Sequence, residues 1–252
     1  MLKTRYFIEL SYLGKNYHGW QLQKNAVTIQ GTLDKVLSLL LNSEMETIGA
    51  GRTDTGVHAK YFVAHFDSEV EFDLLQLCFK LNSFLPKDIS VKTIFPVPSE
   101  AHSRFDAISR TYQYFLCTEK NPFMLDFAAY FFHPLDIGLM NSAAMILFEY
   151  SDFTSFSKLH SDTKTNNCKI MKAVWEEQEK GVFVFTIQAD RFLRNMVRAI
   201  VGTLLDVGHK KISLNDFRKI IEDKNRCNAG QSVPPQGLFL TDIEYPDGMY
   251  GM

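Results

Sequence analysis

The sequence predicts an α+β fold of two pseudo-symmetric βαββαβ halves, each with an antiparallel sheet and its helices on one face. Three observations lead to this fold class. Short segments alternate apolar and polar residues with period two, which indicates strands, and intervening segments repeat apolar residues at helical spacing. The order strand, helix, strand, strand, helix, strand then occurs twice along the 252 residues. This order is that of a split βαβ unit.

The first half contains six predicted elements. Its first helix carries Ile29, Leu33 and Leu37 on one face, and Pro86 ends its second helix because proline lacks a backbone N–H and clashes with the preceding turn. The predicted elements are a strand at 5–13, a helix at 29–41, strands at 45–49 and 61–67, a helix at 72–84 and a strand at 90–97.

The second half repeats this order without obvious sequence repetition. Its predicted elements are a strand at 109–117, a helix at 136–148, strands at 169–177 and 182–189, a helix at 192–207, an additional short helix at 214–222 and a strand at 238–245. The stretch 96–100 contains two prolines and is the predicted linker. We therefore expect domains at 1–98 and 99–252, with an active-site cleft between them.

Composition and charge narrow the class of protein. With 46% hydrophobic and 22% charged residues, the chain can bury a sizeable core. A net charge of −2 argues against indiscriminate nucleic-acid binding, so positive charge for binding RNA must be local. The four cysteines are far apart and no histidines cluster at metal-ligand spacing, so we expect no metal. Neither a signal peptide nor a membrane-spanning run is evident, which predicts a cytoplasmic protein without membrane attachment.

The most informative segment is the glycine-rich stretch 49–59, which lies between two predicted strands. Its glycines at 49, 51 and 56 allow positive φ or a close approach of backbone, and Arg52 and Asp54 lie among them. The segment lacks the third glycine of a dinucleotide-binding fingerprint and the Gly-Lys-Ser/Thr of a phosphate-binding loop. An ordinary turn pair between Arg52 and Asp54 is the alternative to a functional site.

Residues 49–60 (GAGRTDTGVHAK) resemble the active-site signature of the tRNA pseudouridine synthase A family. The resemblance implies that Asp54 is the catalytic carboxylate, acting either as nucleophile or as base. Because the conversion of uridine to pseudouridine is an isomerisation without a change of oxidation state, no cofactor is expected. His58 is interpreted as structural, although an ordinary histidine pKa near neutrality also suits acid–base chemistry.

A second motif opens the second half, where Arg110, Tyr112 and Tyr114 fall on one face of a predicted strand. Aromatic residues in strands usually belong to the core. The arginine-x-tyrosine-x-tyrosine pattern, however, resembles the family's second motif. The resemblance implies that Tyr112 stacks on the target uracil.

A basic stripe is predicted on the helix at 192–207 and its first residues. Arg191, Arg194 and Arg198 fall within a narrow arc at helical spacing, which is either a solvated basic face or the local positive field that RNA requires. Residues 195–202 (NMVRAIVG) resemble the family's third motif. The resemblance implies that Arg198 pairs with the catalytic carboxylate, and Arg194 is assigned only a phosphate contact.

Three further residues complete the predicted site. Residues 236–240 (QGLFL) resemble the family's last strand, which implies that Leu238 lines the uracil pocket, and residues 102–105 (HSRF) supply Arg104 as an RNA contact. A uridine in a stem must be flipped out at a cost of a few kcal/mol. Arg52 is the candidate to fill the vacated space or hold the backbone.

The resemblance covers nearly the full chain and implies a tRNA pseudouridine synthase. The expected substrates are uridines 38, 39 and 40 of the anticodon stem-loop, and the expected assembly is a homodimer bridged by tRNA. A non-catalytic RNA-binding module is the main alternative, because βαββαβ halves with aromatic strand faces also suit single-stranded RNA. A phosphodiester hydrolase using the same carboxylate is a second alternative. Asp54 discriminates, since a pure RNA binder gains nothing from a carboxylate among arginines.

Overall fold

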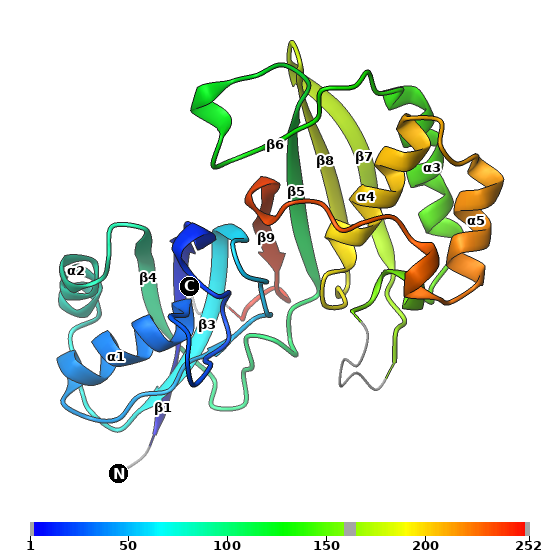
Figure 1. The fold of residues 1–252 in the computed structure, drawn as a ribbon. Coiled ribbons are helices and arrows are strands. Elements are labelled where there is room, and N and C mark those ends of the chain that lie inside the picture. The colour runs from blue at the N-terminus through cyan, green and yellow to red at the C-terminus, as the bar shows by residue number, and fades with distance from the viewer. Residues whose placement is uncertain (1–2, 159–164, 250–252) are drawn as a thin grey trace. The chain divides into compact units, whose positions relative to one another are not determined.

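In the computed structural model, which describes residues 3–158 and 165–249, the chain forms two compact units (Figure 1). The first unit comprises Met1–Ile108 and Leu240–Met252, and the second comprises Ser109–Phe239. The last strand, β9 (Leu238–Glu244), is shared between them, because the chain passes from the second unit back to the first within it.

The first unit is an antiparallel sheet of order β4-β1-β3, with β2 paired to β3, and Figure 1 shows α1 and α2 on the same side of it. Each helix begins after a capping side chain, Thr28 for α1 and Asp73 for α2, which accepts a hydrogen bond from a backbone N–H of the first turn. The elements are β1 (Thr4–Tyr12), α1 (Ile29–Leu41), β2 (Ile48–Gly49), β3 (His58–Ser68), α2 (Leu74–Phe84), β4 (Ile89–Val97) and a 3₁₀ turn at Gly14–Asn16.

The second unit has the strand order β9-β5-β8-β7, antiparallel between β5, β8 and β7, and the short β6 pairs in parallel with β5. Three helices, α3, α4 and α5, pack against one another (Figure 1). The elements are β5 (Ser109–Cys117), β6 (Ala129–Tyr130), α3 (Ile137–Ile146), β7 (Ile170–Glu179), β8 (Val182–Ala189), α4 (Met196–Gly208) and α5 (Leu214–Glu222), with 3₁₀ turns at Pro122–Met124, Leu147–Glu149, Thr154–Phe156, Arg226–Asn228 and Pro235–Gly237.

Both units share one strand order. In each, the last strand lies beside the first, followed by the third and then the second, which gives β4-β1-β3-β2 and β9-β5-β8-β7. The predicted α+β class with two βαββαβ halves is confirmed. The predicted strand at 45–49 is reduced to the two residues of β2, and the two-residue β6 was not predicted.

The units do not coincide with the predicted domains 1–98 and 99–252, because 99–108 and 240–252 belong to the first unit. Arg5 Nη1 donates a hydrogen bond to the carbonyl oxygen of Ala101 (2.9 Å), which ties this segment to β1. The Tyr245 hydroxyl donates to the carbonyl oxygen of Ser103 (2.5 Å), which ties the chain end to the same segment. These contacts join residues far apart in sequence. The domain boundary was predicted from the prolines of the linker, and that local signal gives no information about such contacts.

The predicted helix at 192–207 begins four residues later, at Met196. Asn195 has a φ of 66°, in the left-handed region, and its side-chain amide donates to Ser232 Oγ (2.6 Å). Arg191 and Arg194 therefore precede the helix. The predicted stripe of three arginines on one helix face is wrong, since Arg198 alone of the three lies on α4.

None of the helices in the described ranges combines the length and the apolar character needed to cross a bilayer.

Candidate active site

The glycine-rich segment between β2 and β3 is fixed to its surroundings by hydrogen bonds at several points. Ala50 N–H donates to the carbonyl oxygen of Val63 (2.8 Å) at the start of the segment. The carbonyl oxygen of Thr53 accepts from Trp20 N–H (3.3 Å), and its hydroxyl lies 2.9 Å from the Tyr12 hydroxyl. Thr53 is buried, so the residue directly before Asp54 is anchored on both its main chain and its side chain.

Asp54 opens a tight turn that leads into β3. Val57 N–H donates to the carbonyl oxygen of Asp54 (3.1 Å), and Gly56 N–H donates to that of Tyr17 (3.3 Å). Asp54 is half-buried, between the buried Thr53 and the exposed Thr55. The carboxylate is therefore carried on a fixed main chain at a position that solvent still reaches.

Two of the three glycines have a conformational or steric reason. Gly56 has a φ of 79°, and a Cβ added to Gly49 would lie 2.6 Å from the ring of Trp20. Gly51 has neither constraint, because a Cβ there would meet no heavy atom within 4 Å.

Arg52 is exposed and is connected to the body of the unit through two glutamines. Its Nε donates to Gln21 Oε1 (3.2 Å), and Gln21 Nε2 donates to Gln30 Oε1 (3.0 Å). Gln30, which is buried on α1, donates to the carbonyl oxygen of Thr47 (2.7 Å). This chain of amides supports the arginine from the residue that precedes β2.

Asp34 also holds Thr47, the residue that precedes β2. Its Oδ1 accepts from the Thr47 N–H (2.9 Å) and hydroxyl (2.6 Å). Burial raises the pKa of the Asp34 carboxyl to about 6, although these two hydrogen bonds oppose the shift.

His58 follows the glycine-rich segment and is only 1% exposed. Its Nδ1 accepts a hydrogen bond from Gly14 N–H (3.0 Å), which requires an unprotonated nitrogen at that position. This contact supports the interpretation of His58 as a structural residue.

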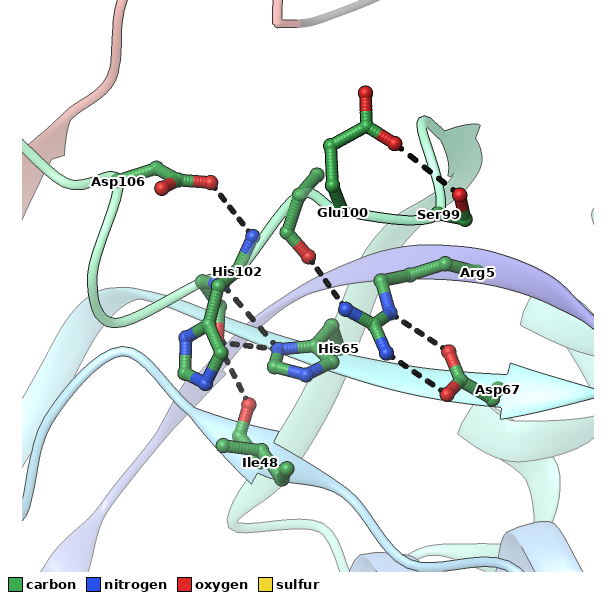
Figure 2. Close-up of polar contacts among 10 residues, drawn as sticks. Arg5, Ile48, His65, Asp67, Ser99, Glu100, His102 and Asp106 are labelled. Atoms are coloured by element: carbon green, nitrogen blue, oxygen red, sulfur yellow. Dashed lines mark hydrogen bonds and ion pairs between the residues drawn. The ribbon is translucent and has the colours of Figure 1, made fainter.

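The turn at residues 101–106 carries Arg104 and is tied to the start of the same segment. Figure 2 shows His65 and Ile48, to which the turn is bonded. Ser103 N–H donates to His65 Nδ1 (3.3 Å), and the Ser103 hydroxyl, 2.8 Å from that nitrogen, donates to the carbonyl oxygen of Ile48 (2.8 Å). Burial, with the neighbouring His102 and Arg5, lowers the pKa of His65 to about 4. A neutral histidine therefore joins the turn to β3, and the Ser103 hydroxyl joins it to β2.

In the second unit, Tyr112 lies on β5 opposite Ile187 of β8 and is half-buried. Its ring meets that of Phe192 edge to face, with centroids 5.2 Å apart. Tyr114, two residues on, is fully buried and its hydroxyl donates to the carbonyl oxygen of Pro234 (3.0 Å). The core interpretation therefore applies to Tyr114, whereas Tyr112 is only half-buried.

Arg198 is held by a segment 35 residues later in the chain. Its Nε donates to the carbonyl oxygen of Val233 (2.8 Å), and Val233 N–H donates to the carbonyl oxygen of Arg198 (3.2 Å). A Cβ on Gly202 would lie 1.8 Å from the carbonyl oxygen of Gln231, so this segment passes directly against α4. Arg194 is exposed, and its main-chain carbonyl accepts from Lys158 N–H (3.0 Å).

Leu238 begins β9 and is 5% exposed. Gly237 precedes it where a Cβ would lie 2.7 Å from the carbonyl oxygen of Phe115. The strand is thus closely packed at this point, and Leu238 is one of the buried hydrophobic residues of the second unit.

The predicted site residues divide between the two units: Arg52, Asp54 and Arg104 belong to the first, and Tyr112, Arg194, Arg198 and Leu238 to the second. The sequence did not reveal the residues that support them, such as Gln30 and Val233. Gln30 carried a usable signal, because it is a polar residue on the apolar stripe of its helix with Leu33 and Leu37. Val233 carried none, since it acts through its main chain.

Comparison with known proteins identifies the family. A sequence model described as tRNA pseudouridine synthase matches residues 10–106 and 144–246. The chain belongs to this tRNA pseudouridine synthase family. It is 57% identical over 251 residues to the tRNA pseudouridine synthase A of Bacteroides fragilis, which covers 99% of this chain and 100% of that protein. It is 54% identical over 247 residues to the tRNA pseudouridine synthase A of Parabacteroides distasonis, covering 98% of each chain.

A more distant relative, the tRNA pseudouridine synthase A of Thermoanaerobacter sp. (strain X514), is 40% identical over 240 residues, covering 94% of this chain and 98% of that protein. The predicted family is therefore confirmed, as is the predicted class of enzyme, a tRNA pseudouridine synthase, which is an isomerase. Among the described residues of this family member, no three histidines, cysteines or carboxylates are grouped to hold a metal ion.

Proposed function

We propose that the chain isomerises uridines 38, 39 and 40 in the anticodon stem-loop of tRNAs, with Asp54 as the catalytic carboxylate. The observation that carries this proposal is the placement of Asp54, half-exposed on a turn whose preceding residue is anchored by Trp20 and Tyr12. A reacting group must be held in a narrow range of positions. A solvent-facing turn pair would not need a buried anchor directly before it.

The reaction breaks the bond between C1′ and N1, rotates the uracil and joins C5 to C1′. The hydrogen of C5 leaves as a proton and N1 takes up a proton, so the product is an isomer of the substrate. The carboxylate either attacks C1′ or removes a proton from the sugar, and both routes require its ionised form. In this proposal Arg198 pairs with the carboxylate, Tyr112 stacks on the target uracil and Leu238 lines its pocket. Arg52, Arg104 and Arg194 contact the RNA.

The support for these further roles differs from residue to residue. The edge-to-face contact with Phe192 fixes the Tyr112 ring, and the hydrogen bond to Val233 fixes the Arg198 guanidinium. Both side chains are therefore preorganised, which suits a ring that stacks on a base and a guanidinium that pairs with a carboxylate. The homodimer bridged by tRNA rests on the family resemblance and stays a prediction, as does the cytoplasmic location expected from the sequence.

Release of tritium from tRNA labelled at uracil C5 tests the proposal directly. The wild-type chain is compared with Asp54→Asn and with Glu71→Gln, an exposed carboxylate in the same unit. We expect release by the wild type and by Glu71→Gln, and a loss of at least about 10³-fold for Asp54→Asn. Binding of tRNA to each variant is measured in parallel by filter retention.

Three outcomes separate the alternatives. Release by Asp54→Asn at the wild-type rate would remove Asp54 from the reaction. Tight tRNA binding without release by any variant would favour a non-catalytic RNA-binding module. Chelator-sensitive cleavage of the labelled tRNA would favour a phosphodiester hydrolase. Mapping of pseudouridines in the product tRNA then tests positions 38, 39 and 40.

A further inference from the structure

Phe105 is a large apolar side chain left 73% exposed at the tip of the turn at residues 101–106. Two polar neighbours flank its ring. The His102 ring lies with its centroid 4.2 Å away at an interplanar angle of 38°, and the Arg104 guanidinium lies 5.6 Å from the ring centroid. An exposed aromatic ring beside a guanidinium and an imidazole is an arrangement that accepts flat, electron-rich groups.

The turn that carries Phe105 is rigidly built. His102 Nδ1 accepts hydrogen bonds from the backbone N–H groups of Arg104 (3.1 Å) and Phe105 (3.3 Å). The backbone N–H of His102 donates to Asp106 Oδ2 (2.7 Å), as Figure 2 shows. A single imidazole thus orients the main chain of Arg104 and Phe105. The aromatic ring is preorganised, which lowers the entropy lost when a partner binds.

The base of the turn connects it to the segment that bears Asp54. Ser103 lies between His65 of β3 and the carbonyl oxygen of Ile48 in β2, and Arg5 of β1 holds Ala101 (Figure 2). Phe105 and Asp54 therefore belong to one hydrogen-bonded framework within the first unit. A ligand seated on Phe105 would be held in a fixed relation to the glycine-rich segment.

We propose that Phe105, supported by His102 and Arg104, is a stacking platform for a nucleobase of the tRNA other than the reacting uridine. The inference rests on the proposed function, because it assigns a further contact to the same RNA. Stacking of a base on an aromatic ring, together with a nearby guanidinium for a phosphate, would orient the stem-loop before the target uridine is flipped. Phe105 is thus a binding residue and takes no part in bond breaking.

A second exposed phenylalanine shows why RNA rather than an apolar protein surface is the expected partner. Phe79 on α2 is also 73% exposed, but Leu75, one helical turn before it, is 83% exposed. Phe79 therefore belongs to an apolar helix face, whereas Phe105 stands among a cation, an imidazole and the carboxylate of Asp106. Phe79 is also a matched control, because its truncation removes the same exposed ring from the same unit.

The test measures the tRNA dissociation constant and the steady-state kinetics of Phe105→Ala, Phe105→Leu, Phe105→Trp and Phe79→Ala. Loss of one base stack is expected to weaken binding and raise KM by about 10-fold for Phe105→Ala. The kcat at saturating tRNA should change by less than about 2-fold, because no reacting group is lost. Phe105→Leu keeps apolar area without a ring and should behave like the alanine variant, whereas Phe105→Trp and Phe79→Ala should bind like the wild type.

Several results would overturn the platform. They are unchanged binding by Phe105→Ala, wild-type binding by Phe105→Leu, and an equal loss for Phe79→Ala. A change in molecular mass of Phe105→Ala in sedimentation, with tRNA affinity intact, would assign the ring to a protein contact instead. Failure of the proposed function is recognised separately, because it appears as absent tritium release by the wild type, whereas this inference is decided by affinity.

Discussion

The segment around Asp54 and the segment around Arg198 each present a charged side chain, but they are held in different ways. The first is braced by buried side chains and by two titratable groups, Asp34 and His65, next to the residues that precede it. In the second, the carbonyl oxygen of Val233 accepts from Arg198 Nε, and the Val233 N–H donates to the carbonyl oxygen of Arg198. We infer that the first segment is sensitive to pH and local sequence, whereas the second depends on packing between distant segments.

Among the substitutions that test this comparison, removal of Arg198 should have the largest effect on activity. An adjacent cation favours the ionised form of a carboxylate, so its loss raises the pH at which a carboxylate ionises. We expect Arg198→Ala to lower kcat by about 100-fold or more near neutral pH, with a steeper loss as the pH falls. The measurement is kcat between about pH 5.5 and 8.5, a range that lies above the ordinary carboxylate pKa of about 4 and spans that of histidine. Arg198→Lys and Arg218→Ala are measured alongside.

The pH dependence separates a pairing role from a purely structural one. Arg198→Lys retains the positive charge but loses the Nε hydrogen bond to Val233, so it should recover the wild-type pH profile at a reduced rate. Arg218, a half-buried residue of α5 that pairs with Glu149, should be dispensable. A pH profile for Arg198→Ala that runs parallel to the wild type would refute the pairing.

Glycine substitutions test the packing of the two segments. A Cβ on Gly202 would lie 1.8 Å from the carbonyl oxygen of Gln231, and one on Gly14 would lie 2.0 Å from that of Val57. Each alanine variant should lose about 3 kcal/mol or more of stability, because backbone must move. This corresponds to a fall in Tm of about 6 to 12 °C, measured by calorimetry.

Gly51→Ala is the control for both variants, since its Cβ would contact nothing within 4 Å. Its Tm should stay within about 1 °C of the wild type. An unchanged Tm for Gly202→Ala would show that the segment at 230–233 is not held against α4 as described. The same outcome for Gly14→Ala would apply to the turn at Val57.

The same contrast explains how much could be predicted from the sequence. The strands, most of the helices and the glycine-rich segment could be predicted from local periodicity and from residues whose effect on the backbone is local, such as Gly56 with its positive φ. The start of α4 was mispredicted because Asn195 adopts a left-handed conformation stabilised by Ser232, 37 residues away. Arg191 and Arg194 were placed on the helix for the same reason. No local pattern records a contact of that kind.

Acidification should affect the first segment through two groups of opposite sign. His65, with its pKa lowered to about 4 from 6.5, is neutral in the folded chain, so stability falls as the pH drops from about 6.5 to 4. Asp34, with its pKa raised to about 6 from 3.8, takes up its proton more readily when folded, so stability falls as the pH rises from about 4 to 6. Each contribution is at most about 3 kcal/mol.

Single substitutions uncouple the two groups. In His65→Asn, an amide oxygen can accept from Ser103 without titrating, so the remaining Asp34 should make stability decrease from pH 4 to 6 relative to the wild type. Asp34→Asn should show the reverse, a steeper increase over the same range. Urea unfolding at a series of pH values measures both, and parallel curves for the two variants would contradict the assigned pKa directions.

Substitution of Arg52 has the smallest expected effect on activity and tests the role of the glycine-rich segment in RNA binding. If its guanidinium fills the space left by a flipped uridine, Arg52→Ala should reduce kcat/KM on intact tRNA by about 10-fold, because flipping from a stem costs a few kcal/mol. A short flexible oligonucleotide does not impose that cost, so its kcat/KM should fall by less than about 3-fold. The exposed Lys24→Ala serves as a charge control.

The hydrogen bond between Arg52 and Gln21 sharpens this prediction. Gln21→Ala keeps the charge of Arg52 but removes its amide support, so it should show the same preference for the short substrate with a smaller loss on tRNA. If Arg52 instead attracts phosphates in general, its loss should lower kcat/KM for both substrates together, and this effect should be smaller at high salt. Equal losses of kcat/KM on the two substrates would therefore mean that Arg52 attracts the RNA phosphates, and that another residue fills the space left by the flipped uridine.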